Sequence, residues 1–186
     1  MALLKRPLRA TAAALLLAGA LCASQRALAA PTATQVEAVF LFYFSEFVAW
    51  PRGAFGSPQA PIVICVLGND PFDGALDQAV AGERVDGRTI VVRRMRNPDR
   101  AGHCHILYIG ASEAARLPEI LRSLRGRSVL TVSGIQGFAR QGGIVRFVLV
   151  DAHVRLRINM EAARAGGLTL SSKLLSAAQL IGPAAG

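Results

Sequence analysis

The sequence lacks the motifs that mark common nucleotide-binding and hydrolytic sites. It has no G-x-x-x-x-G-K-[ST] loop, no G-x-G-x-x-G after an apolar stretch and no G-x-S-x-G. A hydrolase would therefore have to use Ser133 or Ser171 without the usual context, and Ser171 is more simply a helix cap. The acidic residues are scattered, with no pair that suggests acid–base catalysis. These absences favour a protein that is not an enzyme.

Metal ligands are also scarce. The segment His103-Cys104-His105 could place two histidines on one side of a strand, but His153 is the only other histidine. A structural zinc site needs four ligands. We therefore expect no metal and no other cofactor.

Long hydrophobic runs are absent apart from one near the N-terminus. Lys5, Arg6 and Arg9 precede an apolar run from Ala12 to Ala20, and residues 27–29 (ALA) offer a small-x-small cleavage site. This pattern predicts a secretory signal peptide over residues 1–29 and a domain over residues 30–186. A permanent membrane anchor is the alternative, but the run is shorter than the roughly 20 residues a spanning helix needs.

Cysteine is rare, with three in the chain. Cys22 lies in the predicted signal peptide and follows Leu21, which is too large for a lipoprotein cleavage motif. Export as a soluble protein is therefore expected. Two cysteines in an exported chain, Cys65 and Cys104, most simply form one disulfide, and two buried free thiols are the alternative.

Acidic residues are outnumbered by basic ones. Four of the 21 basic residues and none of the 12 acidic ones lie within residues 1–29, which leaves a net charge of about +5 on the remainder. The excess is spread out, with a denser patch over residues 93–96. An exported protein meets little nucleic acid, so we interpret the charge as a solvated face and expect no nucleic-acid partner.

Aromatic residues make up only 6% of the chain, yet they crowd into residues 39–51, VFLFYFSEFVAWP. Residues 35–50 have helical character and are apolar nearly all round, and Pro51 ends the pattern. Phe40, Phe44 and Phe47 share one helical face, which we expect to pack on a sheet. A membrane span is too short here, so the other aromatics belong either to the core or to a partner-binding surface.

Apolar strand-like runs alternate with helical spacing along the rest of the chain. Strands are predicted at residues 61–67, 89–95, 105–109 and 128–133, followed by a hairpin of 144–150 and 153–158 around Asp151-Ala152. Helices are predicted at 72–81, from Ser112 to about Leu124 with Pro118 expected to shorten or kink it, from Asn159 to Gly166, and from Ser171 or Ser172 to Ile181. The fold class is therefore α/β: a single domain with a mostly parallel central sheet flanked by helices and an antiparallel hairpin near the C-terminus.

One turn is a candidate ligand site. Gly68, Asn69 and Asp70 follow the first predicted strand, and open α/β sheets often bind ligands at such strand ends. A plain turn is the simpler interpretation. A small-ligand sensor using this turn stays open as an alternative function.

Several segments, in order, resemble the YfiR family of small periplasmic proteins. They are residues 40–51 (FLFYFSEFVAWP), 65–72 (CVLGNDPF), 104–109 (CHILYI), 142–147 (GGIVRF) with Ile158-Asn159, and 163–175 (ARAGGLTLSSKLL). The resemblance implies a periplasmic repressor that binds the periplasmic sensor domain of an inner-membrane diguanylate cyclase. It implies low cyclic-di-GMP and restrained biofilm formation, a homodimer, and sequestration by an OmpA-like outer-membrane lipoprotein where one is present.

The resemblance also carries residue-level expectations. Cys65 and Cys104 match a disulfide pair of the family, in agreement with the cysteine count. A second disulfide found in some members is missing here, since no cysteine follows Cys104. Tyr43 stands where a polar residue, often Asn, is expected, so partner choice could differ.

We predict that the outer face of the first helix binds the partner. Leu41, Tyr43 and Trp50 are assigned to that face, because Trp and Tyr are favoured interface anchors. The triplet Ser171, Ser172 and Lys173 is a second candidate for partner contact. The core is the alternative for all of the apolar positions.

Overall fold

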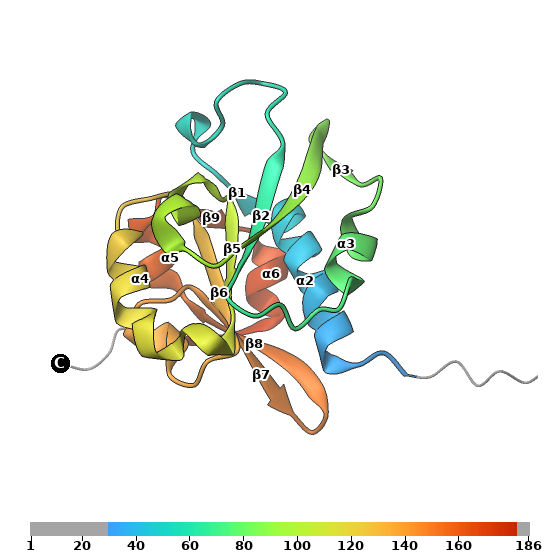
Figure 1. Cartoon of the computed structure of the whole chain (residues 1–186), viewed down its shortest axis with the longest axis vertical. Helices are drawn as coiled ribbons and strands as arrows, with labels where there is room; N and C mark the ends of the chain where they lie inside the picture. The colour runs from blue at the N-terminus through green and yellow to red at the C-terminus, as the bar shows by residue number, and fades with distance from the viewer. Residues whose placement is uncertain (1–29, 182–186) are drawn as a thin grey trace, which may run out of the picture. The chain divides into compact units, whose positions relative to one another are not determined.

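The architecture rests on an eight-stranded sheet with the strand order β10-β8-β7-β6-β5-β2-β4-β3. The computed structural model describes residues 30–181, so the predicted signal peptide lies outside the described residues. The strands are β2 (Ile62–Leu67), β3 (Arg84–Val85), β4 (Arg88–Met95), β5 (Ile106–Ile109), β6 (Leu130–Ser133), β7 (Val145–Val150), β8 (His153–Asn159) and β10 (Ala178–Ile181) (Figure 1).

Five of the seven strand pairings in this sheet are parallel. The antiparallel ones are the β7–β8 hairpin and the short pairing of β3 with β4. The hairpin turns at Asp151 and Ala152, both with positive φ, as a two-residue turn requires. The predicted α/β class, with a mostly parallel sheet and a late antiparallel hairpin, is confirmed.

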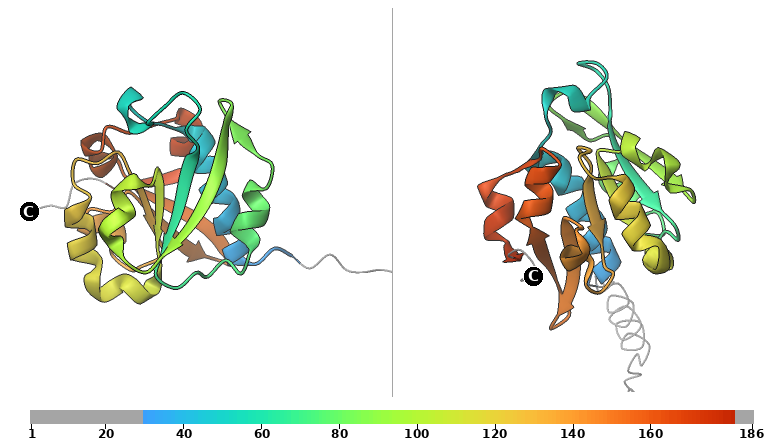
Figure 2. Two further views of the ribbon diagram at one scale, coloured as in Figure 1. Left: turned by 45° about the horizontal axis from the view of Figure 1, so that its top comes forward. Right: turned by 90° about the vertical axis from the view of Figure 1, so that its left-hand side faces the viewer.

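Helices cover both faces of the sheet (Figure 2). One apolar cluster joins the sheet to α2 (Ala33–Phe47), α3 (Ala75–Val80), α5 (Met160–Ala165) and α6 (Ser172–Ser176). A second cluster joins the opposite face to α4 (Leu117–Ser123) and to the 3₁₀ helix η2 (Pro98–His103). The remaining 3₁₀ helices are η1 (Arg52–Ala54), η3 (Ala111–Arg116) and η4 (Phe138–Gln141).

Strand β2 shows why its sequence is apolar throughout. Ile64 and Val66 face the first cluster, and Cys65 and Leu67 face the second. All six of its residues are buried. A central parallel strand covered on both sides needs this continuous pattern, because successive side chains alternate between the faces.

A disulfide joins Cys65 in β2 to Cys104, just before β5. The Cα atoms are 5.9 Å apart and the two residues are 39 positions apart in the chain. Both cysteines are buried in the second cluster. The predicted pairing is confirmed, and it ties two adjacent strands together on the α4 side.

The last helix is shorter than predicted. Helix α6 ends at Ser176, and Ala178–Ile181 form β10, which pairs in parallel with Leu156–Asn159 of β8. The prediction of one helix up to Ile181 is wrong. These four residues carry no strong strand pattern of their own, so their conformation is decided by the free edge of β8.

The helix predicted from Ser112 is divided in two. Residues 111–116 form η3, and α4 begins at Leu117 with Pro118 in its first turn, where a missing N–H is tolerated. Ser112 does not cap a helix; its hydroxyl accepts a hydrogen bond from the Asn69 N–H at 3.0 Å. The shortening expected from Pro118 is confirmed.

Candidate functional site

Helix α2 buries one stripe against the sheet. Its N-terminus is closed by a capping box between Thr32 and Gln35. Leu41 and Phe44 are fully buried, and the Phe44 ring stacks 6.0 Å from that of Phe147 in β7. The expectation that Phe40, Phe44 and Phe47 pack inward is confirmed, with Phe40 and Phe47 only partly buried against the core. The placement of Leu41 on the outer face is wrong, because Leu41 follows the buried Ala38 by three residues and so shares its side of the helix.

The outer face of α2 exposes apolar and aromatic side chains. Val39 is 41% exposed and Tyr43 is 42% exposed. The Tyr43 ring lies 6.0 Å from that of Phe47, one turn further on, and 5.4 Å from that of Phe42. Neighbouring exposed apolar and aromatic side chains make this face a candidate interaction surface.

A short two-stranded sheet brings the two predicted partner-binding segments together. The chain leaves α2 as β1 (Val48–Ala49), which pairs antiparallel with β9 (Thr169–Leu170). The Ser171 N–H donates to the Phe47 carbonyl at 2.9 Å. The 171–173 triplet therefore lies beside the C-terminal end of α2, so that the two segments form one strip.

We call this strip the α2–α6 surface, and it consists of Val39, Tyr43, Phe47, Ser171, Ser172 and Lys173. Ser171 is the N-cap of α6, where its hydroxyl accepts from the Leu174 N–H at 3.3 Å. Ser172 and Lys173 are exposed. The surface thus has an aromatic part on α2 and a polar, positively charged part at the start of α6.

Trp50 lies elsewhere. The helix ends at Phe47, and the Trp50 indole N–H donates to the His105 carbonyl at 3.2 Å. Its ring meets those of Phe55 and His105 edge-on. The assignment of Trp50 to the outer face of the helix is wrong, because the extended residues 48–49 carry it toward the start of β5.

His105 supports this corner as a neutral imidazole. The Val63 N–H donates to its Nδ1 at 3.0 Å, which leaves Nε2 to donate to the Ala54 carbonyl at 3.3 Å. Burial is the main cause of a lowered pKa of His105. Both ring nitrogens are committed to the backbone, so they hold loop 54–63 rather than a metal ion.

Ser133, the other candidate nucleophile, has a structural role, and the metal candidates are not grouped. The Ser133 hydroxyl is fully buried, donates to the Ile109 carbonyl at 2.7 Å and accepts from the Ile135 N–H at 3.1 Å. Within residues 30–181, no three His, Cys, Asp or Glu side chains are grouped as a metal site would need. Ser133 thus stabilises the end of β6, and its hydroxyl already makes hydrogen bonds as donor and as acceptor.

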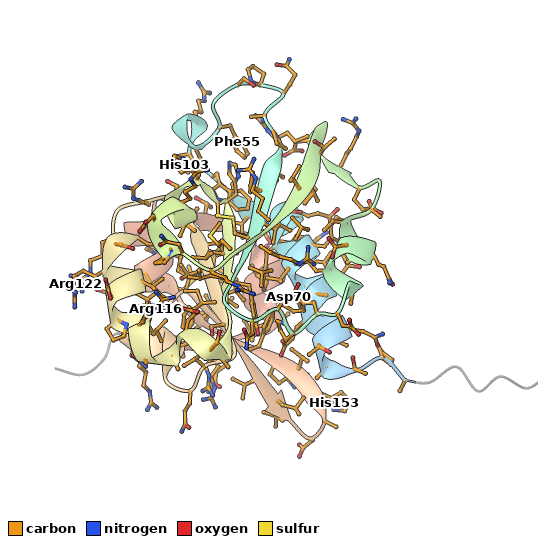
Figure 3. The ribbon with its side chains drawn as sticks, viewed as in Figure 1. Phe55, Asp70, His103, Arg116, Arg122 and His153 are labelled. Atoms are coloured by element: carbon orange, nitrogen blue, oxygen red, sulfur yellow. A yellow bond between two sulfur atoms is a disulfide. The ribbon has the colours of Figure 1, made fainter. Side chains whose placement is uncertain are left out.

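The turn at Gly68–Asp70 is occupied by the chain itself. A Cβ at Gly68 would lie 2.4 Å from the Ser112 hydroxyl, and Gly68 has a φ of +84°. The Asp70 carboxylate accepts from the Phe72 N–H and pairs with Arg94 at 2.7 Å (Figure 3). These contacts account for the glycine and the aspartate by turn geometry and by an ion pair with β4.

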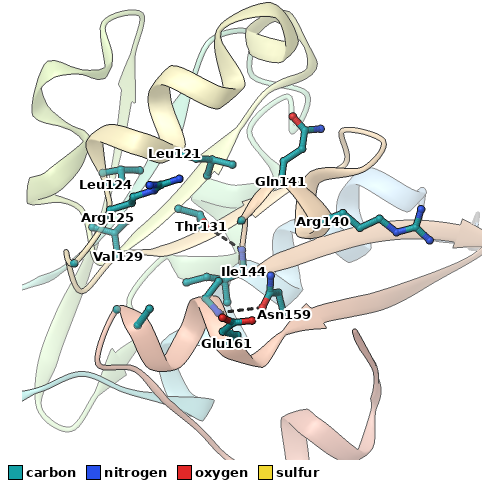
Figure 4. A pocket seen from close by; sticks show the side chains of 15 residues that line it. Leu121, Leu124, Arg125, Val129, Thr131, Arg140, Gln141, Ile144, Asn159 and Glu161 are labelled. Atoms are coloured by element: carbon teal, nitrogen blue, oxygen red, sulfur yellow. Dashed lines mark hydrogen bonds between the residues drawn. The ribbon is translucent and has the colours of Figure 1, made fainter. Parts of the chain in front are cut away.

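An open cavity of about 600 Å³ lies between α4 and α5, away from that turn (Figure 4). Its inner wall is apolar, with Leu121, Val129 and Ile144, and its rim carries Arg125 and Glu161. This volume is within the range of small-molecule sites. The sequence alone does not indicate the cavity, because its walls come from three separate segments, 121–131, 140–144 and 159–166.

Among the helices of the described residues, none combines the length and the apolar character needed to cross a membrane. A family model described as YfiR/HmsC-like matches residues 34–179, from the first turn of α2 into β10. The match includes both cysteines and all of the α2–α6 surface. The resemblance drawn from the motifs is thereby confirmed. The chain belongs to the YfiR/HmsC-like family, whose members are periplasmic and regulatory rather than catalytic.

Proposed function

We propose that this protein is a periplasmic negative regulator that binds the periplasmic sensor domain of an inner-membrane diguanylate cyclase. By holding the cyclase inactive it keeps cyclic-di-GMP and biofilm formation low. Membership of the YfiR/HmsC-like family over residues 34–179 is the observation that carries this proposal. The exposed α2–α6 surface supports it, because a binding protein needs a surface of this type.

The α2–α6 surface is the proposed docking site for the sensor domain. Tyr43 offers a rigid ring with a polar tip, of the kind enriched at binding hot spots. Lys173 adds a positive charge at the rim, which would guide the approach of an acidic partner. The ring of Tyr43 would then contribute mainly to affinity. The charge of Lys173 would contribute mainly to the association rate.

Repression would work by a population shift. The protein would bind the inactive conformation of the sensor domain better than the active one. A difference of about 1–3 kcal/mol between the two affinities is a typical coupling energy and gives useful repression. An OmpA-like outer-membrane lipoprotein that occupies the same surface would relieve the block, and a homodimer would present that surface twice.

The test uses a deletion strain with a fluorescent cyclic-di-GMP reporter. Deletion should raise cyclic-di-GMP, and the exported wild-type protein should restore the low level, whereas a form without residues 1–29 should not. Tyr43→Arg should fail to restore it. Leu149→Arg, a matched change at a position that is 61% exposed on the β7–β8 hairpin, should restore it.

Two outcomes would count against the proposal. An unchanged reporter signal on deletion would contradict cyclase repression. Full repression by Tyr43→Arg would contradict the α2–α6 surface and leave the rest of the proposal standing. Thermal unfolding of each purified variant shows that an inactive form is folded.

A small-ligand sensor that acts with another membrane signalling protein is the second candidate function. The cavity between α4 and α5 favours it, because the turn at Gly68–Asp70 is filled by the chain's own contacts. A ligand that raises the melting temperature of the wild type, but not of Ala165→Trp at the cavity wall, would support this function. A panel of periplasmic metabolites that shifts neither protein would count against it.

A further inference from the structure

Three arginines converge on a second, smaller hollow that the proposed function does not use. The hollow has a volume of about 420 Å³ and is lined by Arg140 of η4, Arg146 of β7 and Arg157 of β8, with Gln179 and Leu180 of β10 closing one side. None of the lining residues that the structure describes is acidic. It lies on the sheet face opposite α2, since the neighbours Val145 and Phe147 belong to the α2 cluster.

The two strand arginines stand directly opposite each other. Arg146 pairs with Arg157 in the antiparallel register of the hairpin, and Arg157 pairs with Gln179 in β10. Like charges directly opposite on a ladder are destabilising. Arg157 Nε–H donates to the Gln179 side-chain oxygen at 3.0 Å, but this amide brings no negative charge to the row.

Arg146 carries the strongest sign of a missing partner. Its Nε is buried and has no hydrogen-bond partner among the residues that the structure describes. Burial and the neighbouring charges of Arg157 and Arg140 lower the pKa of Arg146. A buried, unpaired guanidinium N–H costs free energy, which an acceptor would recover if a shift of the Arg146 side chain brought the two together.

We propose that this hollow is an oxyanion site that takes a phosphate group, either as inorganic phosphate or at the end of a phosphomonoester. Arginines from three elements line the hollow, and a tetrahedral dianion can accept from several guanidinium groups at once. Leu180, which is 52% exposed, would lie beside the ester group. The site does not depend on the proposed function and lies on different elements from the α2–α6 surface.

Binding of inorganic phosphate to the purified protein tests this site. Isothermal titration at matched ionic strength should give a saturable isotherm for the wild type. Arg146→Met and Arg157→Met should each weaken binding about tenfold or more, because each removes charge-assisted hydrogen bonds. Arg122→Gln is the matched control; it removes an arginine that projects from α4 and should leave the isotherm unchanged (Figure 3).

A second readout separates the site from general salt effects. Phosphate stabilises many proteins without saturation by exclusion from their surface. A saturable rise in melting temperature for the wild type, lost in Arg146→Met, therefore supports the site. Without phosphate, Arg146→Met should melt no lower than the wild type, because it removes the unpaired donor and the repulsion. The same measurement shows whether Arg146→Met is folded.

The source of the phosphate group can be distinguished with phenyl phosphate. Tighter binding of phenyl phosphate than of inorganic phosphate would assign the site to a phosphomonoester, and weaker binding would assign it to free phosphate. The proposal is overturned if the wild type shows no saturable binding of either compound in the millimolar range. It is also overturned if Arg146→Met and Arg157→Met bind as well as the wild type.

Discussion

At the scale of single residues, Glu37 shows how the packing of α2 changes a titration. Burial raises the pKa of Glu37 to about 7. Burial raises the pKa of Tyr108, and the negative charge of Glu37 raises it further. The Glu37 carboxyl group, on this largely apolar helix, is thus held mainly protonated in slightly acidic solution.

This shift gives stability a defined pH dependence. The pKa of Glu37 is higher in the folded than in the unfolded chain, so the folded state binds the extra proton between about pH 4.5 and 7. Its contribution to stability is therefore most favourable below that window and declines as the pH rises through it. Glu37→Gln should remove this decline, because the amide keeps the shape without the charge.

Thermal unfolding at about pH 5 and about pH 8 measures the effect. The difference in melting temperature, Glu37→Gln minus wild type, should be more positive at about pH 8 than at about pH 5. Glu46→Gln, at an exposed position of the same helix, is the matched control variant. Equal differences at both pH values for Glu37→Gln would contradict the assignment.

Substitutions at Ser171, the N-cap of α6, and at the adjacent Ser172 should distinguish a structural role from a binding role. Ser171→Ala removes the hydroxyl that accepts from the Leu174 N–H and should cost about 1 kcal/mol of stability. Ser172→Ala, at an exposed position, should change stability by only a few tenths of that. Chemical denaturation measures both, and similar losses would show that the cap is not made by Ser171.

At the scale of elements, local sequence predicted those whose own residues determine them. The alternating strands and helices, the hairpin turn and the effect of Pro118 all follow from short-range rules. The two-residue turn also fixes the register that places Arg146 opposite Arg157, so that juxtaposition could have been read from the sequence. The burial of the Arg146 Nε could not, because it depends on η4 and β10.

Elements decided by distant partners were predicted less well. The helical pattern predicts a helix up to residue 50, whereas α2 ends at Phe47, because pairing of β1 with β9 draws the chain into an extended form. Leu41 lies on the buried side of the helix rather than the outer side. Trp50 lies beyond the end of the helix. The cavity between α4 and α5 is likewise built from segments that meet only in the fold.

The disulfide between β2 and the start of β5 is an element-scale link with a measurable effect. It closes a loop with a sequence separation of 39, which corresponds to about 3–4 kcal/mol in the chain-entropy model. The double change Cys65→Ala and Cys104→Ala should lower the free energy of unfolding by about that amount. Denaturation of the wild type with and without a reductant is the companion measurement.

Reductant should bring the wild type close to the double variant and should leave the double variant unchanged. A stability of the wild type that does not respond to reductant, under conditions that expose both sulfurs, would contradict the link.

At the scale of the whole molecule, two separate faces have different properties. The α2–α6 surface offers aromatic rings and a lysine for a protein partner, whereas the three-arginine hollow offers clustered positive charge for a small anion. The family match covers the first face and the part of the second that lies before Leu180. A regulator could therefore receive a signal at one face and bind its partner at the other, and the two can be disabled independently by Arg146→Met and Tyr43→Arg.

The central claim is tested most directly on spheroplasts of the deletion strain, which expose the periplasmic face of the inner membrane. Purified wild-type protein is added outside while a reporter measures cyclic-di-GMP inside. The account predicts a saturable fall in cyclic-di-GMP with wild type and no fall with Tyr43→Arg. A reporter signal that wild-type protein leaves unchanged at every concentration would contradict repression of a membrane diguanylate cyclase.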